Sequence, residues 1–395
     1  MRRPSLLAVL LPAVLLATDS ARAEAQVTFE TRDGWSFTFA GNVSAFYIFE
    51  HEAAGGEVTT PGALVGIGRQ GSSIRSGYLP AFAVFDAKRT EGTTRLGVHF
   101  GFAPQVQTTG GHDDSTGVGA RIDMRQVYLT VGGAWGQVLA GREVGVFGRQ
   151  SMLSDMSLFG VGATGGSFGN PAGTTLGRSG FGYIYPGFNA QFTYSTPQSR
   201  TVQLTVGAFD PSVNNDFTEF LLPRIEAEVT SDLRGGRLWA GAMLQPQRDT
   251  ALGRSASAWG LTGGTRITAG SFTMAASAYV GSGLGTTLLF RDGRSADAAA
   301  AQLRHSSGYL AQFTWNRPDS PLTLGLGWGE STLRSRGNEP FFRTRNASIT
   351  GGAYFRPTPS LRVVGEATLA RSRDADPATR ANESIGMATG LMLFF

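Results

Sequence analysis

The amino-acid sequence predicts an all-β protein, a transmembrane antiparallel β-barrel of about 16 strands. Three observations support this fold class: an amino-terminal export signal, apolar residues that alternate with period two, and connections that are alternately short and long. Together they predict a signal peptide at residues 1–23, which is removed, and a single barrel domain over residues 24–395.

The first 23 residues have the three parts of a secretory signal peptide. Arg2 and Arg3 form a positively charged start, and residues 6–17 are predominantly apolar. The small residues Ala21 and Ala23 then occupy the two positions that a signal peptidase reads. The apolar run is too short to span about 30 Å of hydrocarbon comfortably, so cleavage after Ala23 is favoured over a membrane anchor.

The composition favours strands and argues against several other classes of protein. Glycine (55 residues) and phenylalanine (26 residues) are abundant, and charged residues make up only 16 % of the chain. Cysteine is absent, which suits a protein that must cross an oxidising compartment unfolded. The formal net charge of +4 is diffuse, and Lys88 is the only lysine, so nucleic-acid binding is not expected. The four histidines show no metal-ligand spacing, and neither a metal nor a cofactor is expected.

Alternation with period two is the dominant pattern of the chain. In residues 201–208, 271–280 and 322–328, apolar side chains occupy every second position, which places one set of side chains on each face of a strand. A soluble β-sandwich alternates in the same way. These strands, however, run to about 9 to 11 residues or more, the length that a tilted membrane strand needs.

About sixteen candidate strands follow from this pattern, and an even number is what bacterial single-chain barrels have. They lie near residues 35–49, 78–88, 93–103, 121–131, 136–143, 181–196, 201–210, 222–230, 237–246, 255–268, 271–281, 307–316, 321–330, 344–355, 359–370 and 384–395.

The predicted strands are joined by connections of two kinds. Short connections such as 132–135, 268–271 and 357–359 alternate with longer, mostly polar ones. Short turns on one side and long loops on the other are typical of outer-membrane barrels, and they place both termini on the periplasmic side. The terminal Phe395 resembles the carboxy-terminal signal that barrel-assembly machinery recognises. The longer connections are 50–77, 104–120, 210–221, 282–306, 331–343 and 371–382.

One further connection, residues 144–180, differs from the rest. It is long, rich in glycine and fairly apolar, with few charges other than Arg149 and Asp155. Loops of this length are usually functional or disordered, and disordered loops are polar. The apolar content therefore predicts that this loop folds into the barrel.

The region from Arg125 to Arg178 resembles the trimeric general porins of Gram-negative bacteria. Residues 125–142 are similar to their strand–turn–strand block that ends in Gly-Arg. Asp155-Met156 matches the acidic residue and methionine of their third extracellular loop, which folds into the lumen and sets the constriction. Gly177-Arg178 matches the start of their next strand. The Pro-Glu-Phe turn that these porins have in the loop is missing here.

The resemblance implies a set of residues at the constriction. In such porins, acidic loop residues face arginines across the pore, and the field between them selects solutes. Carried over to this chain, Asp155 lies on the loop, with Arg125 and Arg178 on the wall. The alternative for each arginine is a solvated position at the rim or an ordinary ion pair. Further candidates for the constriction are Arg75, Arg95, Arg142 and Glu143.

No constellation of residues in the sequence indicates an enzyme. His112-Asp113-Asp114-Ser115 contains residue types found in catalytic sites, but it falls in a predicted polar external loop. A bare loop or a weak divalent-cation site is the simpler interpretation.

The resemblance implies a general diffusion porin, a homotrimer that passes small hydrophilic solutes through the outer membrane of a Gram-negative bacterium. The excess of arginine suggests a preference for anions. Expected partners are outer-membrane lipids, lipopolysaccharide and the barrel-assembly machinery. Two alternatives stay open: a substrate-specific channel for sugars or dicarboxylates, and a non-conducting structural or adhesin barrel.

Overall fold

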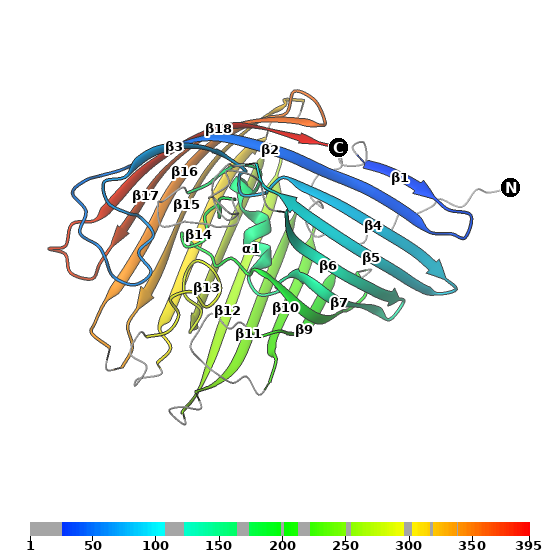
Figure 1. Cartoon of the computed structure of the whole chain (residues 1–395), viewed down its shortest axis with the longest axis horizontal. Coiled ribbons are helices and arrows are strands. Elements are labelled where there is room, and N and C mark those ends of the chain that lie inside the picture. Colours follow the sequence, from blue (N-terminus) through cyan, green and yellow to red (C-terminus); the bar gives the residue numbers. More distant parts are fainter. Residues whose placement is uncertain are drawn as a thin grey trace, which may run out of the picture.

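The computed structural model describes residues 26–106, 122–163, 174–198, 201–211, 222–249, 254–295, 302–316, 319–337 and 339–395. These residues form an antiparallel β-barrel whose strands follow one another around the wall largely in chain order (Figure 1). The predicted signal peptide and the motif His112-Asp113-Asp114-Ser115 lie outside the described residues. Within the described ranges, no helix is long and apolar enough to cross a membrane.

Strands make up nearly all of the regular structure. They are β1 (Gln26–Glu30), β2 (Ser36–Glu52), β3 (Gln70–Arg75), β4 (Phe82–Glu91), β5 (Thr94–Pro104), β6 (Ile122–Gly133), β7 (Gly136–Val144), β8 (Phe188–Ser195), β9 (Val202–Phe209), β10 (Arg224–Leu233), β11 (Gly236–Asp249), β12 (Arg254–Ala269), β13 (Phe272–Ser282), β14 (His305–Asn316), β15 (Leu322–Arg334), β16 (Arg343–Phe355), β17 (Leu361–Arg373) and β18 (Asn382–Phe394).

Sixteen strand positions close the barrel, which confirms the predicted fold class. The long strand β2 pairs with β18 on one side and with β4 and then β3 on the other. The short strand β1 pairs with the start of β2, beyond the end of β18. β1 therefore lies in line with β18, and β3 lies in line with β4. Each of these two pairs counts as one strand of the ring, which leaves sixteen. A closed ring leaves no unpaired edge, which would be costly in lipid.

The pairing of β2 with β18 closes the ring, and we call it the seam. Phe395, directly after β18, strengthens the seam. Phe395 exchanges two backbone hydrogen bonds with Gly41 in β2, with N···O distances of 2.8 and 3.0 Å. Its ring packs against Phe39, with the centroids 5.4 Å apart. Gly41 cannot be replaced without a shift, because a Cβ atom there would lie 2.8 Å from the Phe395 ring and 2.3 Å from the carbonyl oxygen of Phe82.

Side chains alternate between the two faces of the wall. On the outside, large aliphatic and aromatic residues such as Leu326, Ile349 and Leu369 are exposed. On the inside, polar residues such as Asn346 and Thr368 are buried. A belt of exposed apolar side chains would be a liability in water, whereas it is the surface that a lipid bilayer requires.

Two predicted strands differ from the structure. Residues 181–187 were expected to begin a strand, but they belong to the connection before β8. Residues 78–81 turn away from the wall between β3 and β4, and the backbone N–H of Tyr78 donates to the carbonyl of Gly160 at 2.8 Å. In both places, contacts made inside the lumen replace the hydrogen bonds of the wall.

The connections are sorted by length, as predicted. Short turns join β4 to β5, β6 to β7 and β12 to β13 at one end of the barrel, which we call the short-turn end. Three long connections begin at the other, long-loop end. They are the first loop (residues 53–69), the third loop (residues 145–187) and the sixth loop (residues 283–304).

Candidate functional site

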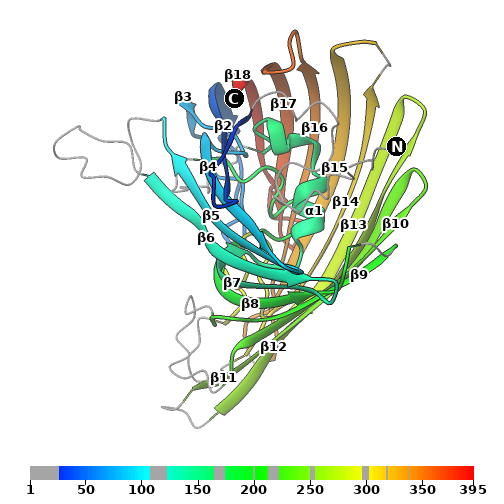
Figure 2. The same ribbon diagram turned by 90° about the vertical axis from the view of Figure 1, so that its right-hand side faces the viewer.

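The third loop crosses the inside of the barrel. It carries the short helix α1 (Arg149–Ser154) and the 3-10 helix η2 (Met156–Phe159). In both views of the molecule α1 lies within the ring of strands (Figures 1 and 2). Gly148 precedes α1 in the left-handed conformation (φ 84°), which glycine adopts without strain. The inward path predicted for this loop is confirmed.

Side chains of the inner wall hold the loop at three places. Glu226 of β10 accepts hydrogen bonds from the backbone N–H groups of residues 146 and 147, at 2.6 and 2.8 Å. Glu366 of β17 accepts from those of residues 161 and 162, at 2.7 and 2.8 Å. Between them, Gln312 of β14 accepts from the first N–H of η2 at 3.0 Å. The segment from residue 146 to residue 162 is thus held at both of its ends and near its middle, each time by a different strand of the wall.

Asp155 and Arg178 meet inside the lumen as a fully buried ion pair. Nε and Nη2 of Arg178 donate to Oδ1 of Asp155 at 2.9 and 2.7 Å. The carboxylate also accepts from the hydroxyl of Tyr183 at 2.7 Å and from the backbone N–H of Ser157 at 3.0 Å. Burial alone would raise the pKa of Asp155, but the guanidinium of Arg178 and these hydrogen bonds hold that pKa below its ordinary value.

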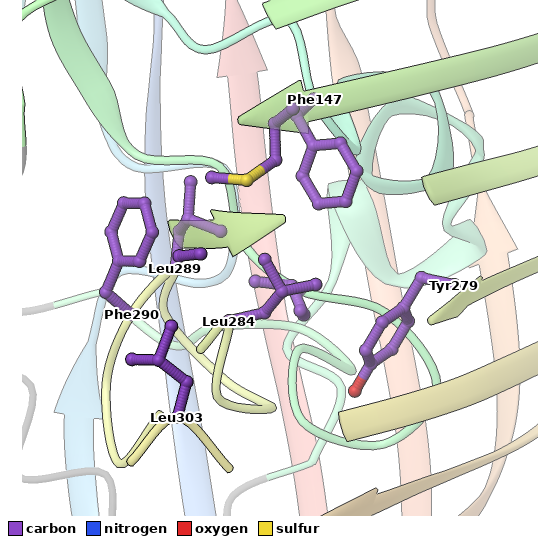
Figure 3. Close-up of a cluster of buried hydrophobic side chains, with 9 residues drawn as sticks. Phe147, Tyr279, Leu284, Leu289, Phe290 and Leu303 are labelled. Carbon is purple, nitrogen blue, oxygen red and sulfur yellow. The ribbon is translucent and has the colours of Figure 1, made fainter. Parts of the chain in front are cut away.

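The sixth loop also folds into the lumen, which corrects the expectation that residues 282–306 form a polar external connection. Its apolar side chains pack with those of the third loop against β11, β12 and β13 (Figure 3). The backbone of Tyr185 links the two loops, donating to the carbonyl of Thr287 at 2.7 Å and accepting from the N–H of Leu289 at 3.1 Å. The shared cluster consists of Phe147, Ile184, Met243, Ala258, Tyr279, Leu284, Leu289, Phe290 and Leu303.

The first loop covers the lumen beside β16, β17 and β18. Asn382 of β18 donates through Nδ2 to the carbonyls of Val58 and Val65, each at 2.8 Å. Asn346 of β16 accepts from the backbone N–H of Leu64 at 3.2 Å. Three loops therefore narrow the lumen from the long-loop end.

A hollow of about 430 Å³ is bordered by α1 and by the inner face of the wall from β4 to β11. On its lining, Arg149 of α1 forms an ion pair with Glu228 at 2.8 Å, and Nδ1 of His99 lies 3.0 Å from the carboxylate of Asp86. The ring of His99 also stacks on Tyr128, with centroids 4.6 Å apart. A polar hollow of this size can hold water and a small hydrophilic molecule. The acidic and basic lining residues are Asp86, Lys88, Arg95, His99, Glu143, Arg149, Glu228 and Arg237.

The predicted constriction residues occupy three different settings. Asp155 and Arg178 pair with each other and are closed to solvent, so their charges compensate one another. Arg95 and Glu143 line the hollow. Arg95 donates to the carbonyl of Gly133 at 3.2 Å, and Glu143 accepts from the side chain of Gln126 at 2.8 and 3.1 Å.

The other three predicted arginines lie away from the hollow. Arg125 pairs with Asp123 at 2.7 Å, and Arg75 donates to the carbonyl of Thr174 in the third loop at 2.7 Å. Arg142 is exposed, and it alternates along β7 with side chains that line the hollow, such as Glu143. Since neighbouring residues of a strand point to opposite faces, Arg142 lies on the outer face of the barrel.

Sequence reasoning missed the wall residues that hold the third loop. Glu226, Glu228 and Glu366 fall in predicted strands, at positions where the alternation places inward side chains. The available signal was their charge, because a carboxylate within a membrane strand must face the lumen. Arg149 was noted as a loop charge, but its partner Glu228 could not be identified from sequence spacing.

Comparisons with known proteins agree with this architecture. The outer membrane channel DcaP of Acinetobacter baumannii aligns with a TM-score of 0.67 at 15 % identity, over 93 % of this chain and 99 % of that one. The anion-selective porin from Comamonas acidovorans gives 0.63 at 12 % identity, over 91 % and 100 %. The trimer form of in-vitro folded OmpT from Vibrio cholerae gives 0.56 at 12 % identity, over 92 % and 100 %.

A search of curated proteins gives no match. At the identities above, the solved structures establish the fold alone. A profile of the Gram-negative porin family, however, matches residues 8–375, which is nearly the whole sequence. The chain therefore belongs to the Gram-negative porin family, a family of outer-membrane channels rather than enzymes.

Proposed function

We propose that this porin is a passive channel for small hydrophilic solutes. The observation that carries the proposal is the polar, charge-lined hollow of about 430 Å³ beside α1, inside a closed barrel. A barrel with a purely structural role has no need of a polar internal space, whereas polar walls keep water in the lumen of a channel.

Liposome swelling tests this proposal. Protein reconstituted into liposomes should let small sugars enter, at rates that fall as the sugar becomes larger. The same protein, heat-denatured before reconstitution, should give the rate of empty liposomes. Absence of permeation for every solute would contradict the channel and favour the non-conducting structural or adhesin barrel.

We further propose that solutes pass between α1 and the wall formed by β5 to β10. Arg149 and Glu228 lie at this boundary, and Glu143 and His99 stand on the wall beside them. In this proposal Asp155 and Arg178 support the third loop, and they do not act as opposing charges across an open passage.

A preference for anions is the finer part of the proposal. Basic side chains outnumber acidic ones on the lining, and the similarly folded Comamonas acidovorans protein is an anion-selective porin. Reversal potentials across a salt gradient in planar bilayers should therefore indicate anion selectivity. The variant K88Q/R95Q should be less anion-selective, whereas R142Q, on the outer face, should match the wild type. Cation selectivity of the wild type would contradict the preference.

A substrate-specific channel for sugars or dicarboxylates is the second candidate. The three loops that fold into the lumen favour it. They narrow the passage, and a narrow passage can place enough side chains around one solute to form a saturable binding site. Saturable block of the ion current by one class of solute would support it. Block by none of the sugars and dicarboxylates tested would leave the general diffusion channel.

We propose that the chain is exported by its signal peptide, is inserted by the barrel-assembly machinery and forms a homotrimer. The trimer form of the similarly folded OmpT supports the oligomeric state. Native mass spectrometry of detergent-extracted protein tests it, and a mass equal to one chain would contradict a trimer.

A further inference from the structure

The charges that line the hollow beside α1 are sorted along the passage. The lining reaches the turns at the short-turn end, where it includes Ala134 and Gln198. Close to these turns lie three basic lining residues, which we call the basic mouth: Lys88, Arg95 and Arg237. Further from the turns lie three acidic lining residues, which we call the acidic interior: Asp86, Glu143 and Glu228. The other two acidic or basic lining residues, His99 and Arg149, lie among the acidic interior.

The basic mouth keeps an excess of positive charge. Arg95 makes no ion pair within the residues that the structure describes: it donates to the carbonyl of Gly133 at 3.2 Å, and its Nε is buried without an acceptor. Arg237 pairs with Asp232 at 2.6 Å, but their side chains are 42 % and 56 % exposed, so water weakens the pair. An anion that enters from the short-turn end therefore meets unbalanced positive charge.

The acidic interior keeps an excess of negative charge. The carboxylate oxygens of Glu143 accept from Nε2 of Gln126 at 2.8 and 3.1 Å and from the next backbone N–H at 2.7 Å. Glu143 is thus only an acceptor here, as an ionised carboxylate is, and no cation pairs with it in the described part of the chain. Glu228 is balanced by Arg149. Three carboxylates are offset by one guanidinium and by an imidazole, which is neutral at about pH 8.

We propose that this order of charges makes the porin an ionic rectifier, which conducts better when the long-loop side is positive. Mobile anions collect in the basic mouth and mobile cations in the acidic interior, because fixed charges attract ions of opposite sign. A positive potential on the long-loop side drives both kinds of ion towards the boundary between the two regions, where they accumulate. The opposite potential withdraws both, and the boundary is depleted of carriers. The inference rests on the proposed conduction through this hollow.

Single channels in neutral phosphatidylcholine bilayers at about pH 8 test the inference. At about 0.01 M salt the Debye length is about 30 Å, so the fixed charges act through the whole hollow. The current with the long-loop side positive should then exceed the current at the opposite voltage about twofold, the effect of one unscreened unit charge about 10 Å away in water. At about 1 M salt, where the Debye length is about 3 Å, the two currents should be equal.

Two variants separate the order of the charges from the net charge of the lumen. R95Q/R237Q removes most of the basic mouth, and E143Q removes the unpaired acid, so both should bring the low-salt current ratio towards one. Their effects on the reversal potential should be opposite, because R95Q/R237Q lowers anion selectivity and E143Q raises it. R142Q, on the outer face, should keep the wild-type ratio. Wild-type conductance of every variant at about 1 M salt shows that each one folds.

The direction of rectification requires the orientation of each inserted channel. The chain has no cysteine, so Ala378→Cys, in the exposed connection between β17 and β18, places a single thiol at the long-loop end. A biotin attached to this thiol binds streptavidin, which is too large to pass through the channel. The chamber in which added streptavidin disturbs the current therefore faces the long-loop end.

Equal currents at opposite voltages in low salt would overturn the rectifier and leave the channel intact, whereas the absence of any current would contradict the proposed function itself. A larger current with the long-loop side negative would also overturn the inference. So would a wild-type current ratio in either R95Q/R237Q or E143Q, because the ratio would then not depend on the two charged regions.

Discussion

Asp155 and Arg178 are both fully enclosed, so each charge is tolerated only because the other is beside it. Solvated charges on a pore wall would act on solutes, whereas this pair ties the segment after α1 to the segment that returns towards β8. Removing one partner of such a buried pair costs about 3–5 kcal/mol, because the remaining charge is left uncompensated. The pair therefore belongs to the support of the third loop.

Asp155→Asn should loosen the third loop without unfolding the barrel. The neutral amide cannot balance the guanidinium of Arg178, so the loop should open more often. Trypsin should then cut at Arg149 or Arg178 about tenfold faster or more than in the wild type, because local opening exposes these bonds. The variant D155N/R178Q keeps only the Arg149 site of these two, and it should recover part of the resistance at Arg149, since it also removes the orphaned charge. Identical cleavage rates in wild type and D155N would show that the pair does not hold the loop.

The same pair predicts a response to acid. In the folded loop the pKa of Asp155 lies below its ordinary value, so the contribution of the pair is complete above the unfolded-state pKa of about 3.9. It is lost as the pH falls through the still lower folded-state pKa. Single-channel conductance should show no Asp155-dependent change between pH 5 and 8, and the loop should loosen only in strong acid. A conductance step within pH 5 to 8 that disappears in D155N would be incompatible with this picture.

At the scale of single elements, strands were more predictable than loops. In a membrane strand, successive side chains face lipid and lumen in turn, so the sequence alternates between apolar and polar residues. Leu324 and Leu326 face outward and Thr344 and Asn346 inward, as their alternation indicates. Residues 181–187 show why this signal can mislead. They carry tyrosines at alternate positions, yet these residues bond to other loops inside the lumen.

The sixth loop shows a second limit of sequence reasoning. Leu284, Leu289 and Phe290 are apolar enough to require burial, and the structure buries them against the third loop. Nothing in their local spacing specifies that partner, because it is more than a hundred positions away in the chain. Asp155 and Arg178 are only 23 positions apart, and both were identified as important residues. Their direct contact was not predicted, because the resemblance placed them on opposite sides of an open pore.

Deletion of residues 286–302 should widen the channel. The ends of the sixth loop already meet, since the N–H of Gly283 donates to the carbonyl of Arg304 at 2.8 Å, so a short glycine link can replace the rest. The third loop would lose part of its packing in the shared cluster. The space that the sixth loop occupied would become part of the open lumen. Single-channel conductance should rise above that of the wild type.

The matched control for this deletion removes residues 376–378, which are exposed at the tip of the connection between β17 and β18. That deletion should leave conductance unchanged, because it takes no side chain out of the lumen. An unchanged conductance after removal of residues 286–302 would show that neither the space freed by the sixth loop nor the reduced packing of the third loop affects conduction.

The barrel as a whole depends on a pattern more than on particular residues. At identities of 15 % and 12 %, the DcaP channel and the Comamonas acidovorans porin still share the fold over more than nine-tenths of this chain. What the pattern requires is alternating strands of sufficient length, short turns at one end and a closed seam. The seam is the one place where the ring depends on two segments from opposite ends of the sequence, β2 and β18.

Phe395 should therefore affect closure of the barrel as well as its assembly in the cell. Phe395→Ala keeps the two backbone hydrogen bonds to Gly41 but loses the ring contact with Phe39. Deletion of the residue loses both. In refolding into detergent micelles, followed by electrophoretic mobility without heating, the deletion should fold more slowly than F395A, and F395A more slowly than the wild type. Leu393→Ala, which removes an outward apolar side chain two residues earlier, is the control.

The amount of protein in the outer membrane then separates two roles for this residue. If the aromatic ring is a signal for the barrel-assembly machinery, F395A should reduce that amount far more than it slows refolding in micelles. If the ring acts only at the seam, both measurements should fall in proportion. Wild-type values for F395A and for the deletion in both experiments would show that the last residue serves neither purpose, and that the pairing of β18 with β2 closes the barrel unaided.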